Sequence, residues 1–159
     1  MAMHNTRNDL PLATRKAMVA LLNARLADAI DLSLQLKQAH WNITGPAFIA
    51  VHELLDKLYG EAQEASDLIA ERARQLGGTA EGTLQAVSAA TALKPYPTAI
   101  NGTDAHLKAV INAMATFGAA IRAAIEASSD AKDADTADIF TEISRASDKG
   151  LWFVESHLR

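Results

Sequence analysis

Apolar residues recur along most of this 159-residue chain at intervals of three or four, the period of a helix with one buried face. Polar stretches, two of which contain glycine and proline, interrupt the repeat and divide it into four long segments. The pattern therefore predicts four long helices. The expected buried positions are Leu22, Leu26, Ile30 and Ser33 in the first helix, Leu107, Val110, Ile111, Met114, Phe117 and Ile121 in the third, and Ile139, Ile143, Ala146, Gly150 and Val154 in the fourth.

The boundaries of the first two helices follow from capping and breaking residues. The first helix is expected from about Pro11 to about Trp41. The second is expected to begin after Thr44, with the threonine as N-cap and Pro46 in the first turn. It should end at the glycine pair 77–78, because glycine commonly follows the last turn of a helix. The two helices then form a hairpin.

A long connector separates this hairpin from the second one. It contains the short amphipathic sequence TLQAVSA and the turn KPYPT, and it ends at Asn101-Gly102. A connector of this length reaches from one end of a helical bundle to the other. Two hairpins with a long crossover favour a ferritin-like four-helix bundle over an up-and-down one, although periodicity alone does not decide the connectivity. The expected fold is all-α, with a short helix in the crossover.

Composition supports this fold and limits the chemistry. About half of the residues are hydrophobic but only 5% are aromatic, and there are no cysteines, so any metal must be held by nitrogen and oxygen ligands. The length suits a single domain, residues 1–159, with a short tail over residues 1–10. We find no apolar signal core and no uninterrupted membrane-spanning run, which predicts a cytoplasmic protein without membrane contact.

Histidines and carboxylates recur at helical spacing in the second predicted helix. His52 and Asp56 are one turn apart, and Asp67 and Glu71 repeat that step. Asp56 and Asp67 share a face but are separated by about 16 Å along the helix axis, so one chain cannot bring both pairs to one metal ion. A two-fold dimer with antiparallel second helices would unite them. His40 would add a ligand if the first two helices lie side by side.

An ordinary explanation of the same residues is a solvated surface with salt bridges. Arg72 and Arg74 lie close in sequence to Glu71, and Lys57 follows Asp56. The Glu-x-x-His element of intra-bundle di-iron sites is absent from the sequence. An intra-bundle di-iron oxygenase is therefore disfavoured, even though the predicted architecture is similar.

The segment from His40 to Gly78, HWNITGPAFIAVHELLDKLYGEAQEASDLIAERARQLGG, resembles the signature region of the Dps family, the DNA-protecting mini-ferritins. The sequence TADIFTEISRASDKGLWFVESHL resembles the last helix of that family. The resemblance implies a bacterial cytoplasmic protein that forms a hollow dodecameric shell with ferroxidase sites at two-fold interfaces, and it leaves nucleoid association open. By matching positions it implies iron ligands, or their close hydrogen-bond partners, at His40, His52 and Asp56 of one subunit and Asp67 and Glu71 of the other, with Trp41 beside the site.

The resemblance also implies the reaction. Histidine and carboxylate ligands suit Fe(II), with Mn(II) and Zn(II) as competitors. We expect Fe(II) oxidation, preferentially by hydrogen peroxide rather than oxygen, and storage of Fe(III) mineral in the cavity, which protects DNA from oxidative damage. Imidazole must be neutral to bind a metal, so activity is expected to fall below about pH 6.

An acidic segment, EASSDAKDADTAD, runs from Glu126 to Asp138. In one subunit it is most simply a solvated loop and a helix N-terminus. Repeated around a three-fold axis, it would attract cations. By resemblance to family pores, Asp133 and Asp138 are the candidate ion-entry residues. Glu61 and Glu64 are further candidates for seeding mineral on the inner surface.

The predicted tail offers little for DNA binding. Residues 1–16 contain Arg7, Arg15 and Lys16 against Asp9, while the whole chain carries −4. Twelve chains would carry −48, which repels phosphate. We therefore expect weak or absent DNA binding at physiological salt.

Two other functions stay open at this level. One is a DNA-compacting or scaffold shell with little ferroxidase activity, and the other is a zinc or manganese buffer that uses the same ligands without turnover. The remaining histidines are isolated in sequence and are interpreted as structural or surface residues: His4, His106 and His157.

Overall fold

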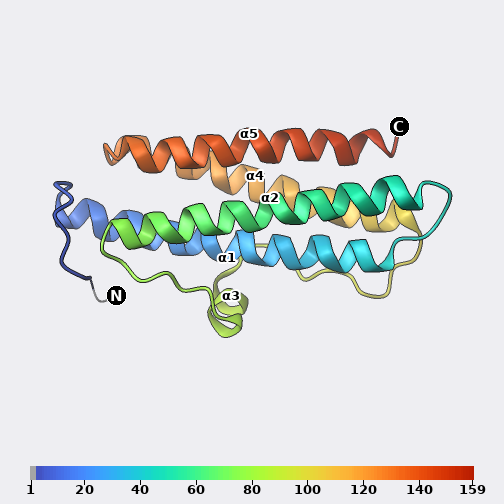
Figure 1. Cartoon of the computed structure of the whole chain (residues 1–159), viewed down its shortest axis with the longest axis horizontal. Coiled ribbons are helices and arrows are strands. Elements are labelled where there is room, and N and C mark those ends of the chain that lie inside the picture. Colours follow the sequence, from blue (N-terminus) through green and yellow to red (C-terminus); the bar gives the residue numbers. More distant parts are fainter. Residues whose placement is uncertain (1–2) are drawn as a thin grey trace.

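A computed structural model describes residues 3–159, and all of its regular elements are helices. The five helices are α1 (Leu12–Asn42), α2 (Phe48–Gln75), α3 (Leu84–Ala90), α4 (Thr103–Asp130) and α5 (Ala134–Ser156) (Figure 1). The part of the chain that the structure describes contains no strand. This confirms the all-α prediction and the short helix in the crossover.

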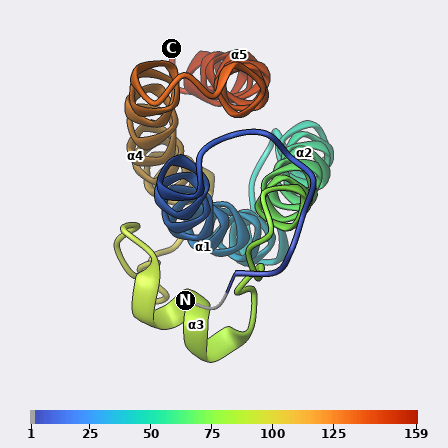
Figure 2. The same cartoon turned by 90° about the vertical axis from the view of Figure 1, so that its left-hand side faces the viewer.

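The four long helices form two hairpins, α1 with α2 and α4 with α5. The hairpins meet through α1 against α4 and α2 against α5 (Figure 2). Helices α2 and α4 run in the same direction, so the chain between them crosses the length of the bundle (Figure 1). Helix α3 lies in this crossover and packs on α1. This is the ferritin-like connectivity, which periodicity alone did not decide.

The predicted apolar stripes form most of the core, with a shift in α5. Three of the predicted positions are only partly buried, namely Ile30, Ile111 and Ile139, and one, Ala146, is exposed. Phe140, which the predicted stripe omitted, is completely buried. Gly150 is buried as predicted, and a Cβ there would lie 2.7 Å from a methyl of Leu58, so glycine allows α5 to pack closely against α2.

Buried polar side chains on α1 hold the crossover in place. The Asn23 amide donates to the carbonyl of Thr79 and accepts from the N–H of Glu81, both at 2.9 Å. The carboxylate of Asp28, which is fully buried, accepts from the N–H of Ala92 at 2.7 Å. These bonds satisfy polar groups that would otherwise be costly to bury. Helix α1 therefore buries polar residues on the face that the crossover covers.

The start of α2 differs from the prediction. The helix begins at Phe48, and Ala47 occupies the N-cap position without a side-chain hydrogen bond. Thr44 lies outside the helix, and its carbonyl accepts a hydrogen bond from the hydroxyl of Thr103. The expectation that Thr44 caps α2 was wrong because the turn between α1 and α2 continues for three more residues before the first helical turn.

The end of α2 holds the N-terminal segment. As predicted, the helix stops at the glycine pair, and Gly77 adopts a left-handed φ of +87°. The N–H of His4 donates to the carbonyl of Gly77 at 2.6 Å. The guanidinium of Arg15 donates to the carbonyls of Leu10 (3.1 Å) and Leu76 (3.2 Å). The beginning of the described chain is therefore packed on the bundle.

One described helix, α4, is long and apolar enough by composition to cross a bilayer. It packs against both α1 and α5, and its apolar stripe contributes to the bundle core. A core helix of a bundle meets the same criterion.

Candidate metal centre

The end of α1 and the beginning of α2 bring two imidazoles into contact. The rings of His40 and His52 are stacked, with centroids 3.6 Å apart and planes inclined by 22°. The Nδ1 of His40 lies 2.9 Å from the carbonyl oxygen of His52, and the Nδ1 of His52 lies 3.1 Å from the carbonyl oxygen of His40. A carbonyl oxygen only accepts hydrogen bonds, so each Nδ1 carries the hydrogen. In the neutral form of each ring, the Nε2 lone pair is then available for a metal ion.

The turn between the helices creates this contact. Gly45 adopts a φ of +126°, a conformation that glycine reaches without strain, and Ile43 anchors the turn in the core. The ring of Phe48 packs against His52 with centroids 5.0 Å apart. His40 is 8% exposed, and His52 is half-buried. The two histidines, twelve residues apart in sequence, thus form a single fixed pair.

Asp56 lies one turn beyond His52 on α2 and is exposed. Its carboxylate forms an ion pair with the ammonium of Lys37 on α1, which also lies 4.8 Å from the ring centroid of Tyr59. The hydrogen bond from Lys37 lowers the pKa of Asp56, and the positive charge of Lys37 acts in the same direction. Asp56 is therefore an ionised ligand candidate. Sequence reasoning missed Lys37, although it precedes His40 by one helical turn.

The second pair of predicted ligands lies elsewhere in the same chain. Asp67 and Glu71 are exposed near the other end of α2. The helix is continuous, which keeps Asp56 and Asp67 about 16 Å apart along its axis. Within residues 3–159, no group of three or more histidines and carboxylates is arranged to hold a metal ion. One chain supplies the stacked histidines with Asp56 nearby, and the assignment of all five ligands stays a prediction.

The surface salt-bridge explanation finds partial support. Asp56 has an ion-pair partner, but it is Lys37 rather than Lys57. Across the described chain, Glu71 forms no ion pair with Arg72 or with any other basic side chain within 4.0 Å. A local salt bridge therefore does not account for Glu71.

The two candidate pore residues occupy different environments. Asp133 is 1% exposed and caps α5: its carboxylate accepts from the N–H and hydroxyl of Thr136 at 3.1 and 2.6 Å. It also accepts from the guanidinium of Arg72 at 2.6 Å. Within one chain the Asp133 carboxylate is therefore buried and fully paired, and its role in an ion-entry pore stays a prediction. Asp138 is exposed, and its role in such a pore also stays a prediction.

Trp41 follows His40 directly, but its indole is 68% exposed. Other large apolar side chains at this end of the molecule are also exposed, among them Ile49 at 61%. Singly exposed apolar side chains are normal on protein surfaces, whereas a contiguous patch of them is typical of a surface that another chain covers. The position of Trp41 beside a metal site stays a prediction.

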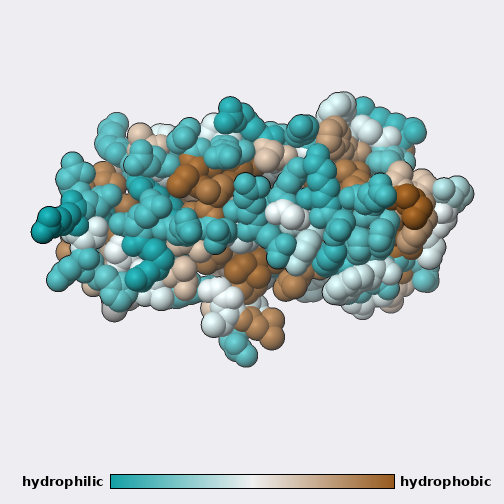
Figure 3. Space-filling view, in the orientation of Figure 1, coloured by the Kyte–Doolittle hydropathy of each residue, from teal (hydrophilic) through white to brown (hydrophobic). Residues whose placement is uncertain are grey.

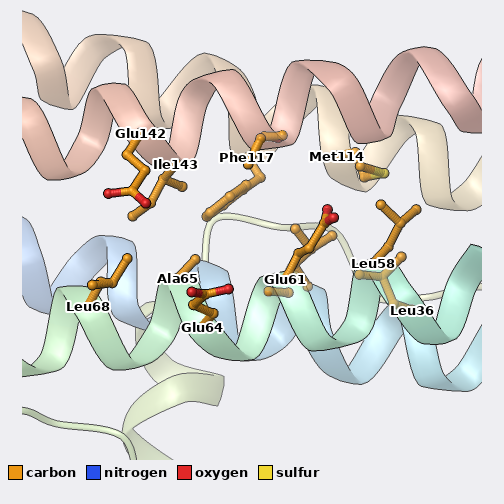
Figure 4. Close-up of a pocket in the computed structure, with 14 residues that line it drawn as sticks. Leu36, Leu58, Glu61, Glu64, Ala65, Leu68, Met114, Phe117, Glu142 and Ile143 are labelled. Carbon is orange, nitrogen blue, oxygen red and sulfur yellow. The ribbon is translucent and has the colours of Figure 1, made fainter.

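The centre of the bundle offers no second metal site among the described residues. Between α2 and α5 there is a cavity of about 230 Å³ whose deep part is apolar, and no histidine lines it. Three glutamates, Glu61, Glu64 and Glu142, stand at its rim (Figure 4). Apolar surface is visible in the furrow between these helices in Figure 3. The arrangement agrees with the absence of a Glu-x-x-His element.

Comparisons with known proteins agree with this architecture. The ferritin-like domain family matches residues 19–159. The DNA protection during starvation protein of Agrobacterium fabrum is 52% identical over 100% of this chain and 98% of its own length. The solved structure of DpsA14 from Streptomyces coelicolor has a TM-score of 0.93 at 32% identity, covering 99% of this chain and 95% of that one. The structure of Mycobacterium smegmatis Dps gives 0.91 at 30% identity, covering 98% and 94%.

The fold and these matches define a ferritin-like protein. Within that class the chain belongs to the Dps family, as the resemblance of residues 40–78 predicted.

Proposed function

We propose that this protein oxidises Fe(II), preferentially with hydrogen peroxide, at sites shared between subunits of a homo-oligomeric shell, and stores the Fe(III) inside. Removal of iron and peroxide would protect DNA, in line with the name of the Agrobacterium fabrum relative. The ferritin-like family supports iron handling. The observation that carries the proposal is the reciprocal bonding of His40 and His52, which leaves two Nε2 atoms free as ligands.

The geometry of one chain and the symmetry of a pair support the proposed ligand set. His40, His52 and Asp56 supply nitrogen and carboxylate donors from one subunit, and Asp67 and Glu71 of a second subunit complete the site when the α2 helices run antiparallel. These donors suit Fe(II), while Mn(II) and Zn(II) would compete. The dodecamer implied by the family provides such two-fold pairs.

The protein groups have separate roles in the reaction. The two Nδ1–H bonds fix the orientation of the imidazoles, which spares the site from reorganising when the ion arrives. The carboxylates of Asp56 and Glu71 offset the positive charge that grows as Fe(II) becomes Fe(III). Lys37 must move away from Asp56 before that carboxylate can bind an ion. Two Fe(II) ions reduce one peroxide with two protons, giving two Fe(III) and two waters, so no hydroxyl radical is released.

The experiment is anaerobic Fe(II) loading of the purified shell, then addition of peroxide, with ferric absorbance and the ratio of iron to peroxide as readouts. The test variant is His52→Ala with Asp56→Ala, and the matched control is Glu53→Ala, an exposed carboxylate between them. Light scattering checks that each variant assembles. We expect rapid oxidation near two Fe(II) per peroxide in the wild type and the control, and its loss in the test variant.

The outcomes also separate the alternatives. Equal slow oxidation in all three proteins would contradict the proposal and favour a scaffold or DNA-compacting shell. Tight metal binding without oxidation would favour a zinc or manganese buffer.

A mixing experiment tests whether the site is shared. Shells are dissociated and reassembled from equal amounts of the His52→Ala, Asp56→Ala chain and an Asp67→Ala, Glu71→Ala chain. Half of the random dimers are mixed, and each mixed dimer has one intact site of two, so activity should recover to about a quarter of the wild type. If oxidation activity does not recover in a mixed and correctly assembled shell, either all five ligands lie on one chain or these residues do not form the site.

A further inference from the structure

The cavity between α2 and α5 combines an apolar interior with an acidic rim. Leu36, Leu58, Met114 and Phe117 line its deep part, and its volume is about 230 Å³ (Figure 4). From these features we infer that the cavity binds a small organic cation with an apolar body, such as an arylalkylammonium ion. None of its lining residues is a ligand of the proposed ferroxidase site, although Glu61 and Glu64 at its rim are also the candidates for seeding mineral, so the inference is tested on the iron-free shell.

The apolar interior selects for a hydrophobic group. An apolar protein cavity of about 150 Å³ is large enough to bind benzene, so this one has room for an aromatic ring and a small head group. The ring of Phe117 and the thioether of Met114 form part of the lining. A ligand ring can pack against another aromatic ring, and methionine sulfur also packs well against aromatic rings. A hydrated inorganic ion would leave this lining unused.

The rim selects for positive charge. Glu61 projects from α2 and Glu142 from α5 into the space between the helices, and Glu64 lies beside them on α2 (Figure 4). No lysine, arginine or histidine lines the cavity. Within residues 3–159, Glu64 and Glu142 have no ion-pair partner, and Glu61 has only a half-exposed Lys57 at 3.6 Å. A bound anion would meet three carboxylates of like charge, whereas a cation would be stabilised by them.

The arrangement of the lining residues determines where the ring and the ammonium group of the ligand would lie. The carboxylates stand on opposite walls, whereas the apolar residues come from α1, α2, α4 and α5 beneath them. A ligand would therefore insert its ring toward Phe117 and keep its ammonium between Glu61 and Glu142. Ala146, an exposed residue of α5 that lines the cavity, offers a position where a larger side chain fills this space without disturbing the core.

The test is isothermal titration of the iron-free assembled shell with benzyltrimethylammonium. Tetramethylammonium, which lacks the ring, and benzyl alcohol, which lacks the charge, serve as comparison probes. We expect both to bind at least about tenfold more weakly, because each loses one of the two interactions. If tetramethylammonium binds as tightly as benzyltrimethylammonium, the binding is only the attraction of counter-ions to an acidic shell, and the inference is overturned.

Variants locate the binding. Ala146→Phe should abolish it by filling the cavity, and Glu142→Gln should weaken it about fivefold by removing one rim charge. Glu126→Gln removes an exposed charge of α4 outside the cavity and should leave binding unchanged. Unchanged binding in Ala146→Phe, or equal weakening in Glu142→Gln and Glu126→Gln, would place the probe elsewhere. Displacement by equimolar Mg²⁺ would likewise contradict an organic-cation site.

Discussion

The guanidinium of Arg72 and the carboxylate of Asp133 form a buried ion pair with 2.6 Å between Nη2 and Oδ1. The two side chains are 5% and 1% exposed, and the pair joins the last turns of α2 to the beginning of α5. The same carboxylate caps α5 through Thr136. Asp133, a candidate pore residue by family resemblance, thus connects the two hairpins.

Arg72→Met should lower the free energy of unfolding by about 3–5 kcal/mol, because it leaves the Asp133 carboxylate buried without its partner. Denaturant unfolding at fixed protein concentration measures this. Arg74→Met is the matched control: Arg74 is exposed and its guanidinium donates one hydrogen bond, to the carbonyl of Gly78 just beyond α2, so the expected effect is about 1 kcal/mol or less. Equal effects of the two substitutions would show that the buried pair is not a main connection.

Lys37→Met should tighten the binding of Fe(II) several-fold at neutral pH, because the ion no longer competes with the ammonium for Asp56. The pKa of Asp56 should rise toward its ordinary value at the same time, since Lys37 is the main cause of its lowering. Metal titration under anaerobic conditions, repeated as a function of pH, checks both effects. Lys57→Met, which removes a neighbouring charge that pairs with Glu61, should change neither.

Gly77→Ala should destabilise the protein by about 1–2 kcal/mol or more, because φ is +87° and the new Cβ would lie 2.7 Å from the carbonyl oxygen of His4. Gly60→Ala is the opposite case: a Cβ there meets nothing within 4 Å, and alanine should stabilise the interior of α2 by about 0.5–1 kcal/mol. Thermal unfolding of both variants gives the comparison. If the two substitutions shift the unfolding temperature by the same amount in the same direction, the turn at Gly77 does not require glycine.

His106 makes stability depend on pH. It is buried, its Nδ1 lies 2.6 Å from the hydroxyl of Tyr96, and burial lowers its pKa. Burial also raises the pKa of Tyr96 to about 12, so the phenol remains a donor at neutral pH. As the pH falls below about 6.5, the unfolded chain binds a proton that the folded chain excludes, and stability decreases until the pH reaches the lowered pKa.

The corresponding measurement is the midpoint of thermal unfolding between pH 7.5 and pH 5.5. The difference between the wild type and His106→Gln should shrink on acidification, because glutamine does not titrate. The difference between the wild type and His157→Gln should stay constant, since His157 is exposed. A constant difference for both variants would show that His106 does not control the acid response.

DNA binding should be weak or absent at physiological salt. The chain carries −4, and Arg15 is engaged with the end of α2 rather than projecting from a free arm. A gel shift at increasing salt checks this, with a polylysine N-terminal extension as the control that the shell can be shifted at all. A tight complex of the unmodified protein that resists salt would contradict the prediction.

The sequence by itself determined the helices, because their apolar periodicity and glycine stops are local properties. It also determined the Dps family, through residues 40–78, and the pairing of His52 with Asp56 on one face of α2. The prediction that Thr44 caps α2 was wrong because a turn with glycine and proline is compatible with several helix starts. Phe140 was missed because the choice between neighbouring positions for the buried stripe of α5 depends on the helix that packs against it.

Only the tertiary structure decided which side chains satisfy one another across elements. The reciprocal bonds of His40 and His52 depend on how the turn at Gly45 folds, and the ion pair of Lys37 with Asp56 depends on the packing of α1 on α2. The burial of Asp133 required α2 and α5 to meet. Such contacts join residues far apart in sequence, and their energies depend on desolvation and geometry that no local pattern contains.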